Sequence, residues 1–262
     1  MDLDLANKRA LVTGSSSGIG AGIARMLAAE GCAVIVHGRN AERVRAVAEG
    51  IRQSGGQAEM AIGDLATAEG AAAVMRVVDD LWGGELDILV SNAGGGAGPA
   101  MPWHEVGEET WIASYEKNVI AATRLIRRYL PGMTARGWGR LIQIGSASAA
   151  QPIAMMPDYA AAKAAMTNMS VSLARSLAGS GVTANTVTPG RILTPAVERA
   201  LGARGPNASW SSDQSDGGSA GTVPMGEPDD IAFAVCMIAS PRSRFITGAN
   251  IRVDGGQVKA VN

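Results

Sequence analysis

A tyrosine and a lysine four residues apart could together transfer a proton. Tyr159 and Lys163 stand in an alanine-rich segment, residues 159–163, that favours a helix. Residues four apart project from one helix face, so the ammonium would lie near the phenol. A free tyrosine has a pKa of ~10, and a nearby positive charge favours the phenolate, which brings the group toward acid/base work. Taken alone, a pair at this spacing is usually an ordinary surface pair.

Ser146 strengthens the catalytic interpretation of this pair. It follows an apolar run at residues 140–145 and precedes Tyr159 by thirteen positions. Parallel sheets bind their ligands beyond the carboxyl ends of the strands, so a hydroxyl at this point is placed to meet a substrate.

A glycine-rich turn at residues 13–20, Thr-Gly-Ser-Ser-Ser-Gly-Ile-Gly, indicates a nucleotide phosphate site. Gly14 allows a tight turn out of the preceding strand, Gly18 lets a pyrophosphate approach the backbone, and Gly20 brings the next helix close to the strand. The unpaired amides at the start of that helix attract phosphate. Glycines also serve ordinary strand-to-helix connections. The residues expected to bind the cofactor in this turn are Gly14, Ser16, Ser17, Gly18 and Ile19.

Short β-rich runs alternate with longer helical stretches along the whole chain. Continuous apolar runs suit strands covered on both faces, and right-handed crossovers between them give a parallel doubly wound sheet. The sequence therefore predicts a single α/β domain over residues 1–262, a Rossmann fold of about seven strands flanked by helices. The expected strands are 9–13, 33–37, 58–62, 86–91, 140–145, 183–188 and 246–253, and a helical pattern covers 227–239.

One segment departs from this pattern. Residues 205–222 are rich in Gly, Ser, Asp and Asn, which favours either a domain linker or a loop over the site. Because a helix and a strand follow it, we expect a flexible substrate lid around residues 190–225.

The residues that follow the second, third and fourth strands indicate which dinucleotide binds. Arg39 stands where NAD-binding proteins carry an acid for the ribose 2′-hydroxyl, and it could pair with a 2′-phosphate instead. NADP(H) is therefore the preferred cofactor, with NAD(H) as the alternative. If Arg39 is simply a solvated side chain at the start of a helix, it does not indicate which cofactor binds. Asp64 stands near the adenine end or caps a helix. Asn92, Ala93 and Gly94 let the backbone come close to a ligand.

Composition excludes several classes of protein. A net charge of -1 with 18% charged residues argues against nucleic-acid binding. No apolar run approaches the ~20 residues that span a bilayer, and acids at the N-terminus argue against a signal peptide. Cys32 and Cys236 are isolated, which favours a reduced, cytoplasmic setting. His37 and His104 have no metal-ligand spacing, so we expect no metal.

The chain resembles the short-chain dehydrogenase/reductase family, in particular its 3-oxoacyl-ACP reductase branch. The resemblance rests on TGxxxGxG at 13–20, NAG at 92–94, YxxxK at 159–163, and a PG motif after the sixth strand, and it covers essentially the whole chain. It implies that Tyr159 is the general acid/base and that Lys163 lowers the tyrosine pKa and holds the nicotinamide ribose. It further implies that Ser146 steadies the substrate oxygen and that Asn118 positions a proton-relay water.

The same resemblance assigns the rest of the cofactor site. Ile192 and Thr194 would contact the nicotinamide carboxamide, beside Pro189 and Gly190 of the PG motif. The residues implied to line the adenosine half are Asp64, Leu65 and Asn92. The family commonly assembles through its C-terminal segment, so a homotetramer or homodimer is expected.

The substrate is expected to be a ketone or secondary alcohol with an apolar or aromatic portion. The residues that suggest an apolar pocket, and that could equally be core or interface, are Met101, Trp103, Ile153, Met155, Met156, Leu193 and Val197. The alternatives are a 3-oxoacyl thioester reductase and an NAD-dependent alcohol dehydrogenase. Outside enzymes they are a non-catalytic nucleotide sensor and a cofactor-independent interaction protein.

Overall fold

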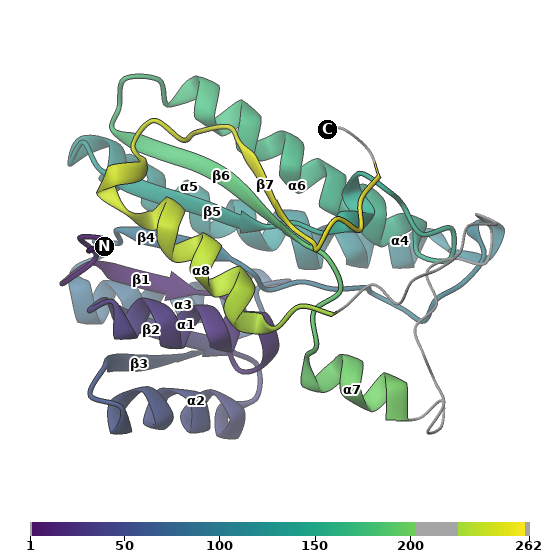
Figure 1. Ribbon diagram of the computed structural model, residues 1–262, viewed down its shortest axis with the longest axis horizontal. Coiled ribbons are helices and arrows are strands. Elements are labelled where there is room, and N and C mark those ends of the chain that lie inside the picture. The colour runs from purple at the N-terminus through teal and green to yellow at the C-terminus, as the bar shows by residue number, and fades with distance from the viewer. Residues whose placement is uncertain (1, 203–224, 260–262) are drawn as a thin grey trace.

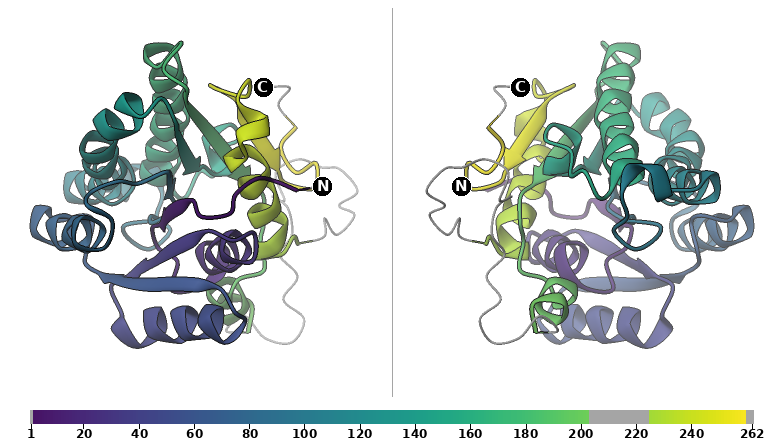
Figure 2. Two further views of the ribbon diagram at one scale, coloured as in Figure 1. Left: turned by 90° about the vertical axis from the view of Figure 1, so that its left-hand side faces the viewer. Right: turned by 90° about the vertical axis from the view of Figure 1, so that its right-hand side faces the viewer.

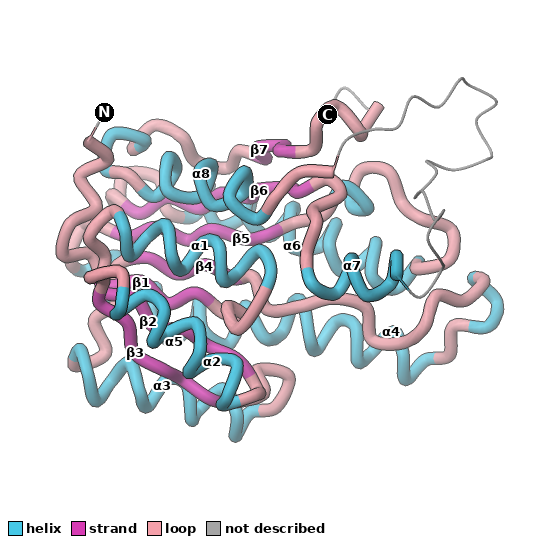
Figure 3. Tube along the Cα trace, turned by 60° about the horizontal axis from the view of Figure 1, so that its bottom comes forward, coloured by secondary structure: helices cyan, strands magenta, loops and turns pink. Residues whose placement is uncertain are grey.

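Apolar, β-branched segments form the strands of one parallel sheet in the computed structural model, which describes residues 2–202 and 225–259 (Figure 1). Seven strands lie in the order β3-β2-β1-β4-β5-β6-β7, and Figure 3 shows them side by side in magenta. All neighbouring pairs are parallel. The strands are β1 (Arg9–Val12), β2 (Ala33–Gly38), β3 (Gln57–Ile62), β4 (Ile88–Ser91), β5 (Gly139–Ile144), β6 (Val182–Pro189) and β7 (Asn250–Val253).

Helices cover both faces of this sheet (Figure 2). Alternate residues of a strand point to opposite faces, so in β1 Ala10 and Val12 join one core and Leu11 joins the other. The first core is covered by α1 (Gly18–Ala29), α2 (Ala41–Gln53) and α8 (Pro228–Ala239). The second is covered by α3 (Ala68–Trp82), α5 (Ala121–Ala135) and α6 (Pro157–Ser176).

The remaining helical segments, apart from a short turn after α8, lie near the carboxyl edge of the sheet. Helix α4 (Glu108–Tyr115) continues through a π-helical turn, η2 (Glu116–Ile120), directly into α5. Helix α7 (Pro195–Gly202) follows β6. Three 3-10 turns complete the described elements: η1 (Trp103–Glu105), η3 (Ala147–Ala149) and η5 (Pro241–Ser243).

The predicted fold is confirmed, with one strand placed too early. Six strands begin and end within two residues of their expected limits. The expected helix at 227–239 is α8, which begins after Glu227, and the Glu227 side chain forms a capping box with Asp230. The seventh strand was expected from residue 246 but starts at Asn250, because Gly248 turns the backbone at φ +71 and its N–H donates to the Ala184 carbonyl. Of the expected lid around residues 190–225, the part at 203–224 lies outside the described residues.

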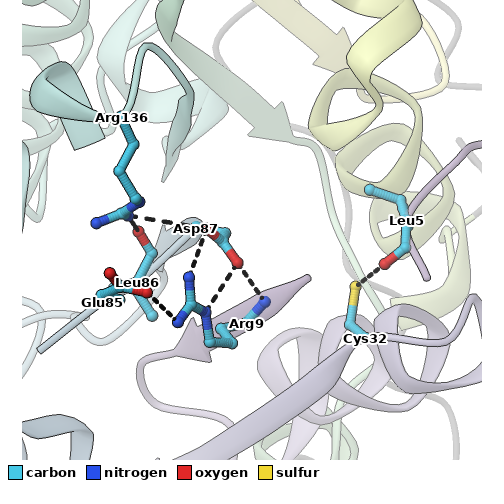
Figure 4. Close-up of polar contacts among 7 residues, drawn as sticks. All are labelled: Leu5, Arg9, Cys32, Glu85, Leu86, Asp87 and Arg136. Atoms are coloured by element: carbon cyan, nitrogen blue, oxygen red, sulfur yellow. Dashed lines mark hydrogen bonds and ion pairs between the residues drawn. The ribbon is translucent and has the colours of Figure 1, made fainter. Parts of the chain in front are cut away.

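An ion-pair cluster closes the amino ends of β1 and β4 (Figure 4). The Asp87 carboxylate accepts from the Arg9 backbone N–H at 2.9 Å and from Arg9 Nε at 3.1 Å. Arg136 Nη2 lies 3.8 Å from the same carboxylate and donates to the Leu86 carbonyl at 2.6 Å. Asp87 is only 8% exposed, whereas Glu85, which also pairs with Arg9, has a half-exposed side chain. Asp87 is therefore expected to contribute more to the stability of the fold than Glu85.

Asp87→Ala is expected to lower the free energy of unfolding by about 2 kcal/mol, because it leaves buried donors of Arg9 without an acceptor. Urea unfolding followed by circular dichroism measures the loss. Glu85→Ala is the matched control and should stay close to wild type, since exposed ion pairs contribute little. Equal losses in the two variants would contradict this assignment.

Candidate nucleotide and catalytic site

The glycine-rich turn between β1 and α1 packs too closely for side chains at two positions. Gly14 has φ +64, and a Cβ there would lie 2.8 Å from Cα of Ala93. A Cβ on Gly20 would lie 2.5 Å from both Nδ2 of Asn92 and the Gly14 carbonyl oxygen. The turn, the start of α1 and the end of β4 are therefore in direct backbone contact, and the first amides of α1 are left facing the cavity edge.

Asn92 supports this turn with its side chain. Its Nδ2 donates to the carbonyls of Thr13 at 2.9 Å and Gly14 at 3.0 Å. In return, Thr13 Oγ1 accepts from the backbone N–H of Asn92 and of Ala93, each at 2.9 Å. Asn92 was predicted to line the adenosine half, but its amide is committed to the glycine turn. The cavity wall beside it is formed by Ala93 and Gly94.

A cavity of about 280 Å³ opens at the carboxyl ends of β1, β2 and β3. Positive charge at this cavity comes from Arg39, Arg43 and Lys117, and Asp64 lies among them. The backbone of the glycine turn forms one wall of the cavity. An anionic nucleotide fits this combination of free amides and cations. Its lining consists of Gly14, Ser16, Ser17, His37, Gly38, Arg39, Arg43, Gly63, Asp64, Leu65, Ala66, Ala93, Gly94 and Lys117.

Arg43 and Lys117 line this cavity although neither was predicted. Arg43 lies in the first turn of α2, whose N-cap Asn40 accepts from the Arg43 N–H at 2.9 Å. The signal available in the sequence was a second arginine four positions after Arg39, at the start of a helix. Lys117 Nζ donates to the Gly96 carbonyl at 2.8 Å, and burial lowers the pKa of Lys117.

Arg39 is held near the cavity by a weak contact. Its Nη1 lies 3.4 Å from Oδ2 of Asp64, and the Arg39 side chain is 68% exposed. Exposed pairs of this kind contribute little, so the guanidinium is available to a ligand anion. Asp64 does not cap α3, because Thr67 is the N-cap and accepts from the Gly70 N–H at 3.0 Å. Asp64 Oδ1 accepts instead from Ala66 N–H within the loop.

Ser146, Tyr159 and Lys163 meet at the carboxyl end of β5. Ser146 is the N-cap of η3 and its hydroxyl accepts from the Ser148 N–H at 3.2 Å; the same hydroxyl is close enough to the Tyr159 phenol to act on the tyrosine pKa. Lys163 Nζ donates to the Ile144 carbonyl at 2.8 Å and lies 5.9 Å from the centre of the Tyr159 ring. Helix α6 thus brings the expected tyrosine and lysine to the serine.

Burial decides the pKa values in this cluster. It raises the pKa of Tyr159, an effect that the Ser146 hydrogen bond only partly offsets. It lowers the pKa of Lys163 to about 8. The expected lowering of the tyrosine pKa by the lysine charge is therefore wrong for the protein alone. Desolvation penalises the charged forms of both groups.

A buried network fixes α6 on the sheet further along the helix. Gln143 of β5 donates through Nε2 to Ser170 Oγ at 3.0 Å, and Thr186 of β6 bonds the same hydroxyl at 2.9 Å. Ser170 lies seven residues after Lys163, two turns along the same face. The face of α6 that carries Tyr159 and Lys163 is therefore held against the sheet at two points, Lys163 and Ser170.

Asn118 lies within the π-helical turn η2 and is fully buried. Its Oδ1 accepts from the Gly95 N–H at 3.1 Å, and its Nδ2 donates to the carbonyls of Gly95 and Ser114. A Cβ on Gly94 would meet both Asn118 and Lys163. Asn118 therefore holds the loop after β4 against the lysine, and its role with a relay water stays a prediction.

The segment after β6 crosses the start of α1. A Cβ on Gly18 would lie 3.2 Å from the Thr194 methyl group, while Thr194 Oγ1 accepts from the Val197 N–H at the start of α7. Ile192 is buried and bridges to Gly226. Pro189 ends β6, and Gly190 packs against Asp254. The structure thus brings Thr194 to the glycine turn, and the nicotinamide contacts of residues 189–194 stay predictions.

Two of the residues expected to form an apolar pocket line a cavity in the structure. Trp103 and Ile153 line an apolar cavity of about 540 Å³ that also includes Ala160, Ala161 and Ala164 of α6. Those alanines are turned by 100° or more from Tyr159 around the helix, so this cavity lies beside the catalytic face. Among the other residues, the Met101 N–H donates to the Met155 carbonyl and joins the loops after β4 and β5.

The parts of the chain that the structure describes contain neither a cluster of metal-ligating side chains nor a helix that could cross a bilayer. No group of three or more His, Cys, Asp and Glu side chains there could hold a metal ion. His37 is buried and bonded at both ring nitrogens, and His104 is exposed beside Glu105. None of the described helices is both long and apolar enough to cross a bilayer.

Comparisons with known proteins agree with this geometry. A family model described as short chain dehydrogenase matches residues 8–203. The chain is 36% identical to the uncharacterized oxidoreductase YvaG of Bacillus subtilis over 100% of both chains. It is 35% identical to the 3-oxoacyl-[acyl-carrier-protein] reductase of Vibrio cholerae, over 97% of this chain and 98% of that protein. The L-sorbose reductase of Gluconobacter frateurii, solved with NADPH and L-sorbose, superimposes with a TM-score of 0.90 at 33% identity over 100% of both chains.

Gly20→Ala is expected to abolish nucleotide binding, because its methyl group would separate α1 from Asn92 and the Gly14 carbonyl. Fluorescence titration with NADPH measures the loss. Gly50→Ala is the matched control: a Cβ at Gly50 in α2 meets nothing within 4 Å, so binding should be unchanged and the free energy of unfolding should rise by about 0.5–1 kcal/mol. Unchanged nucleotide affinity in folded Gly20→Ala would contradict the close-packing argument.

Proposed function

The chain belongs to the short-chain dehydrogenase family, and from this premise we propose that it is an NADP(H)-dependent oxidoreductase interconverting a ketone and a secondary alcohol. One observation carries the proposal. Ser146, Tyr159 and Lys163 meet at the same sheet edge as a cavity lined by cations and by the glycine turn. A non-catalytic nucleotide sensor would have no need of this serine, tyrosine and lysine together.

In the proposed reaction Tyr159 is the acid/base. Its raised pKa keeps the phenol protonated at neutral pH, so it can donate to a carbonyl oxygen during reduction. Ser146 hydrogen-bonds that same oxygen, and Lys163 offsets the charge left on the phenol. A nicotinamide nucleotide, when bound, supplies or accepts the hydride. The expected residues for its nicotinamide end are Lys163, Ile192 and Thr194.

The preference for NADP(H) over NAD(H) rests on two arginines. Arg39 and Arg43 both line the cavity beyond β2, where a ribose 2′-phosphate would lie. Among residues 2–202 and 225–259, neither is paired with a buried carboxylate, and the ion pair of Arg39 is with the half-exposed Asp64. Two guanidinium groups can bind one phosphate through charge-assisted hydrogen bonds.

The proposed substrate carries an apolar or aromatic portion. The support is the apolar cavity with Trp103 and Ile153 beside the catalytic face and the methionine loops that border it. The similarity to a 3-oxoacyl thioester reductase and to an L-sorbose reductase makes acyl thioesters and ketoses the competing classes.

We also propose a cytoplasmic homotetramer or homodimer. Phe233 is 64% and Phe245 is 96% exposed. Large exposed apolar side chains of this kind are typical of protein interfaces.

The function is tested by following NADPH and NADH oxidation in parallel. The panel contains aromatic ketones, alicyclic ketones, 3-oxoacyl thioesters and ketoses. Turnover of aromatic or alicyclic ketones with NADPH preferred is the expected result. Faster turnover with NADH would contradict the cofactor preference, and turnover of thioesters or ketoses alone would contradict the substrate class.

Tyr159→Phe is expected to lower kcat by ~100-fold to ~10,000-fold, because the variant has no proton to donate. Turnover is measured at saturating NADPH on the substrate that the panel identifies. Circular dichroism and Tm should remain near wild type. A folded variant with wild-type kcat would show that another group is the acid/base.

Arg39→Asp is expected to weaken NADPH binding by roughly 10-fold to 100-fold and to spare NADH, because a charged hydrogen bond to the 2′-phosphate is lost. Arg43→Ala should act in the same direction. Arg45→Ala is the matched control, since Arg45 lies on the same helix, is exposed and does not line the cavity. Dissociation constants for both nucleotides give the measurement, and an unchanged ratio would contradict phosphate pairing.

A further inference from the structure

The imidazole of His37 lies between two loops of the nucleotide cavity. His37 is in β2, one residue before its end, and is only 2% exposed. Its Nδ1 lies 3.0 Å from the Gly14 backbone nitrogen and its Nε2 lies 3.1 Å from the Gly63 carbonyl oxygen. Gly14 belongs to the glycine turn, and Gly63 directly precedes Asp64 at the other side of the cavity.

These two contacts define one form of the ring. A carbonyl oxygen only accepts, so Nε2 must carry a proton and donate it to Gly63. The Gly14 N–H only donates, so Nδ1 must be unprotonated. Burial lowers the pKa of His37 to about 4, which keeps the ring neutral at neutral pH.

The His37 side chain joins the loops that follow the two strands on either side of β2. The glycine turn follows β1 and the Gly63 loop follows β3, and β2 lies between those two strands. The His37 backbone already joins β2 to the glycine turn, since its N–H donates to Ser15 Oγ and its carbonyl accepts from the Ser15 N–H. The side chain extends that connection across β2 to Gly63.

We propose that His37 is a positioning residue of the nucleotide site, whose imidazole fixes the glycine turn relative to the loop that carries Asp64 and Leu65. The inference rests on the proposed function, because it assigns the glycine turn to the cofactor diphosphate and the Asp64 loop to its adenosine half. A dinucleotide must contact both loops at once, so their separation sets its affinity.

A buried histidine that merely fills space gives a different expectation. In that case any side chain of similar volume would preserve binding, and the two ring nitrogens would have no separate effects. Two amide side chains distinguish the cases, because Asn places an oxygen where Nδ1 lies and Gln places an NH₂ where Nε2 lies. His37→Asn keeps the acceptor for Gly14, and His37→Gln keeps the donor to Gly63.

The experiment measures dissociation constants for NADPH and for adenosine 2′,5′-bisphosphate, which lacks the diphosphate bridge and the nicotinamide half. His37→Gln is expected to weaken NADPH about tenfold and the bisphosphate by less than about threefold, since only the glycine turn is released. His37→Asn is expected to weaken both ligands about tenfold, since the adenosine loop is released.

A measurement without nucleotide tests the same link. In His37→Leu, hydrogen exchange should accelerate in peptides covering both 13–18 and 62–67, because the imidazole connects them. If the Leu variant does not fold, the two amide variants provide the same comparison. Exchange should then accelerate in residues 13–18 of His37→Gln and in residues 62–67 of His37→Asn.

Cys32→Ala is the control for a general loss of stability. Cys32 is buried at the other end of the same strand and donates through Sγ to the Leu5 carbonyl (Figure 4). It should lower Tm without changing either affinity. Wild-type affinities in folded Asn and Gln variants, or equal losses in Cys32→Ala, would overturn the inference alone. Failure of the wild-type protein to bind either nucleotide would overturn the proposed function with it.

Discussion

Lys163 is buried with no carboxylate partner among the described residues, and the catalytic half of the structure depends on this constraint. Its ammonium donates to the Ile144 carbonyl at 2.8 Å, and burial lowers its pKa to about 8. Burying a charged group is costly unless hydrogen bonds compensate, so α6 must lie tightly against the end of β5. That position in turn places Tyr159 against Ser146. The network of Gln143, Ser170 and Thr186 holds the helix there from its other end.

The cofactor half depends on contacts between loops rather than on a buried charge. Asn92 joins the glycine turn to β4, and His37 joins it to β2 and to the loop after β3. Glycines at positions 14 and 20 allow these approaches because a Cβ at either would meet another atom within 2.8 Å. The backbone that borders the cavity is therefore held in position by the side chains of Asn92 and His37.

Electrostatics divides the site into two regions. Around the nucleotide cavity, exposed arginines make weak contacts that a phosphate can replace. Around Tyr159, burial raises the tyrosine pKa, so the phenol is protonated at neutral pH before any ligand binds, and it lowers the pKa of Lys163 to about 8, which leaves the ammonium charged there. The first region is suited to bind charge, and the second to transfer a proton from a protonated phenol.

The sequence by itself determined the helix and sheet layers of a doubly wound parallel fold and several of the residues that meet at the carboxyl edge of its sheet, whereas the order of the strands comes from the structure. Strand and helix periodicity are local properties, and parallel strands necessarily gather their ends, so Gly14, Ser146 and Tyr159 could be placed without coordinates. Only the tertiary structure decided the late start of β7, the π-helical turn around Asn118, and the parts played by Arg43, Lys117, Asn92 and His37. It also reversed the expected pKa shift of Tyr159. The physical reason is the same throughout: hydrogen bonds, desolvation and close packing depend on neighbours that lie 20 to 80 positions away along the chain.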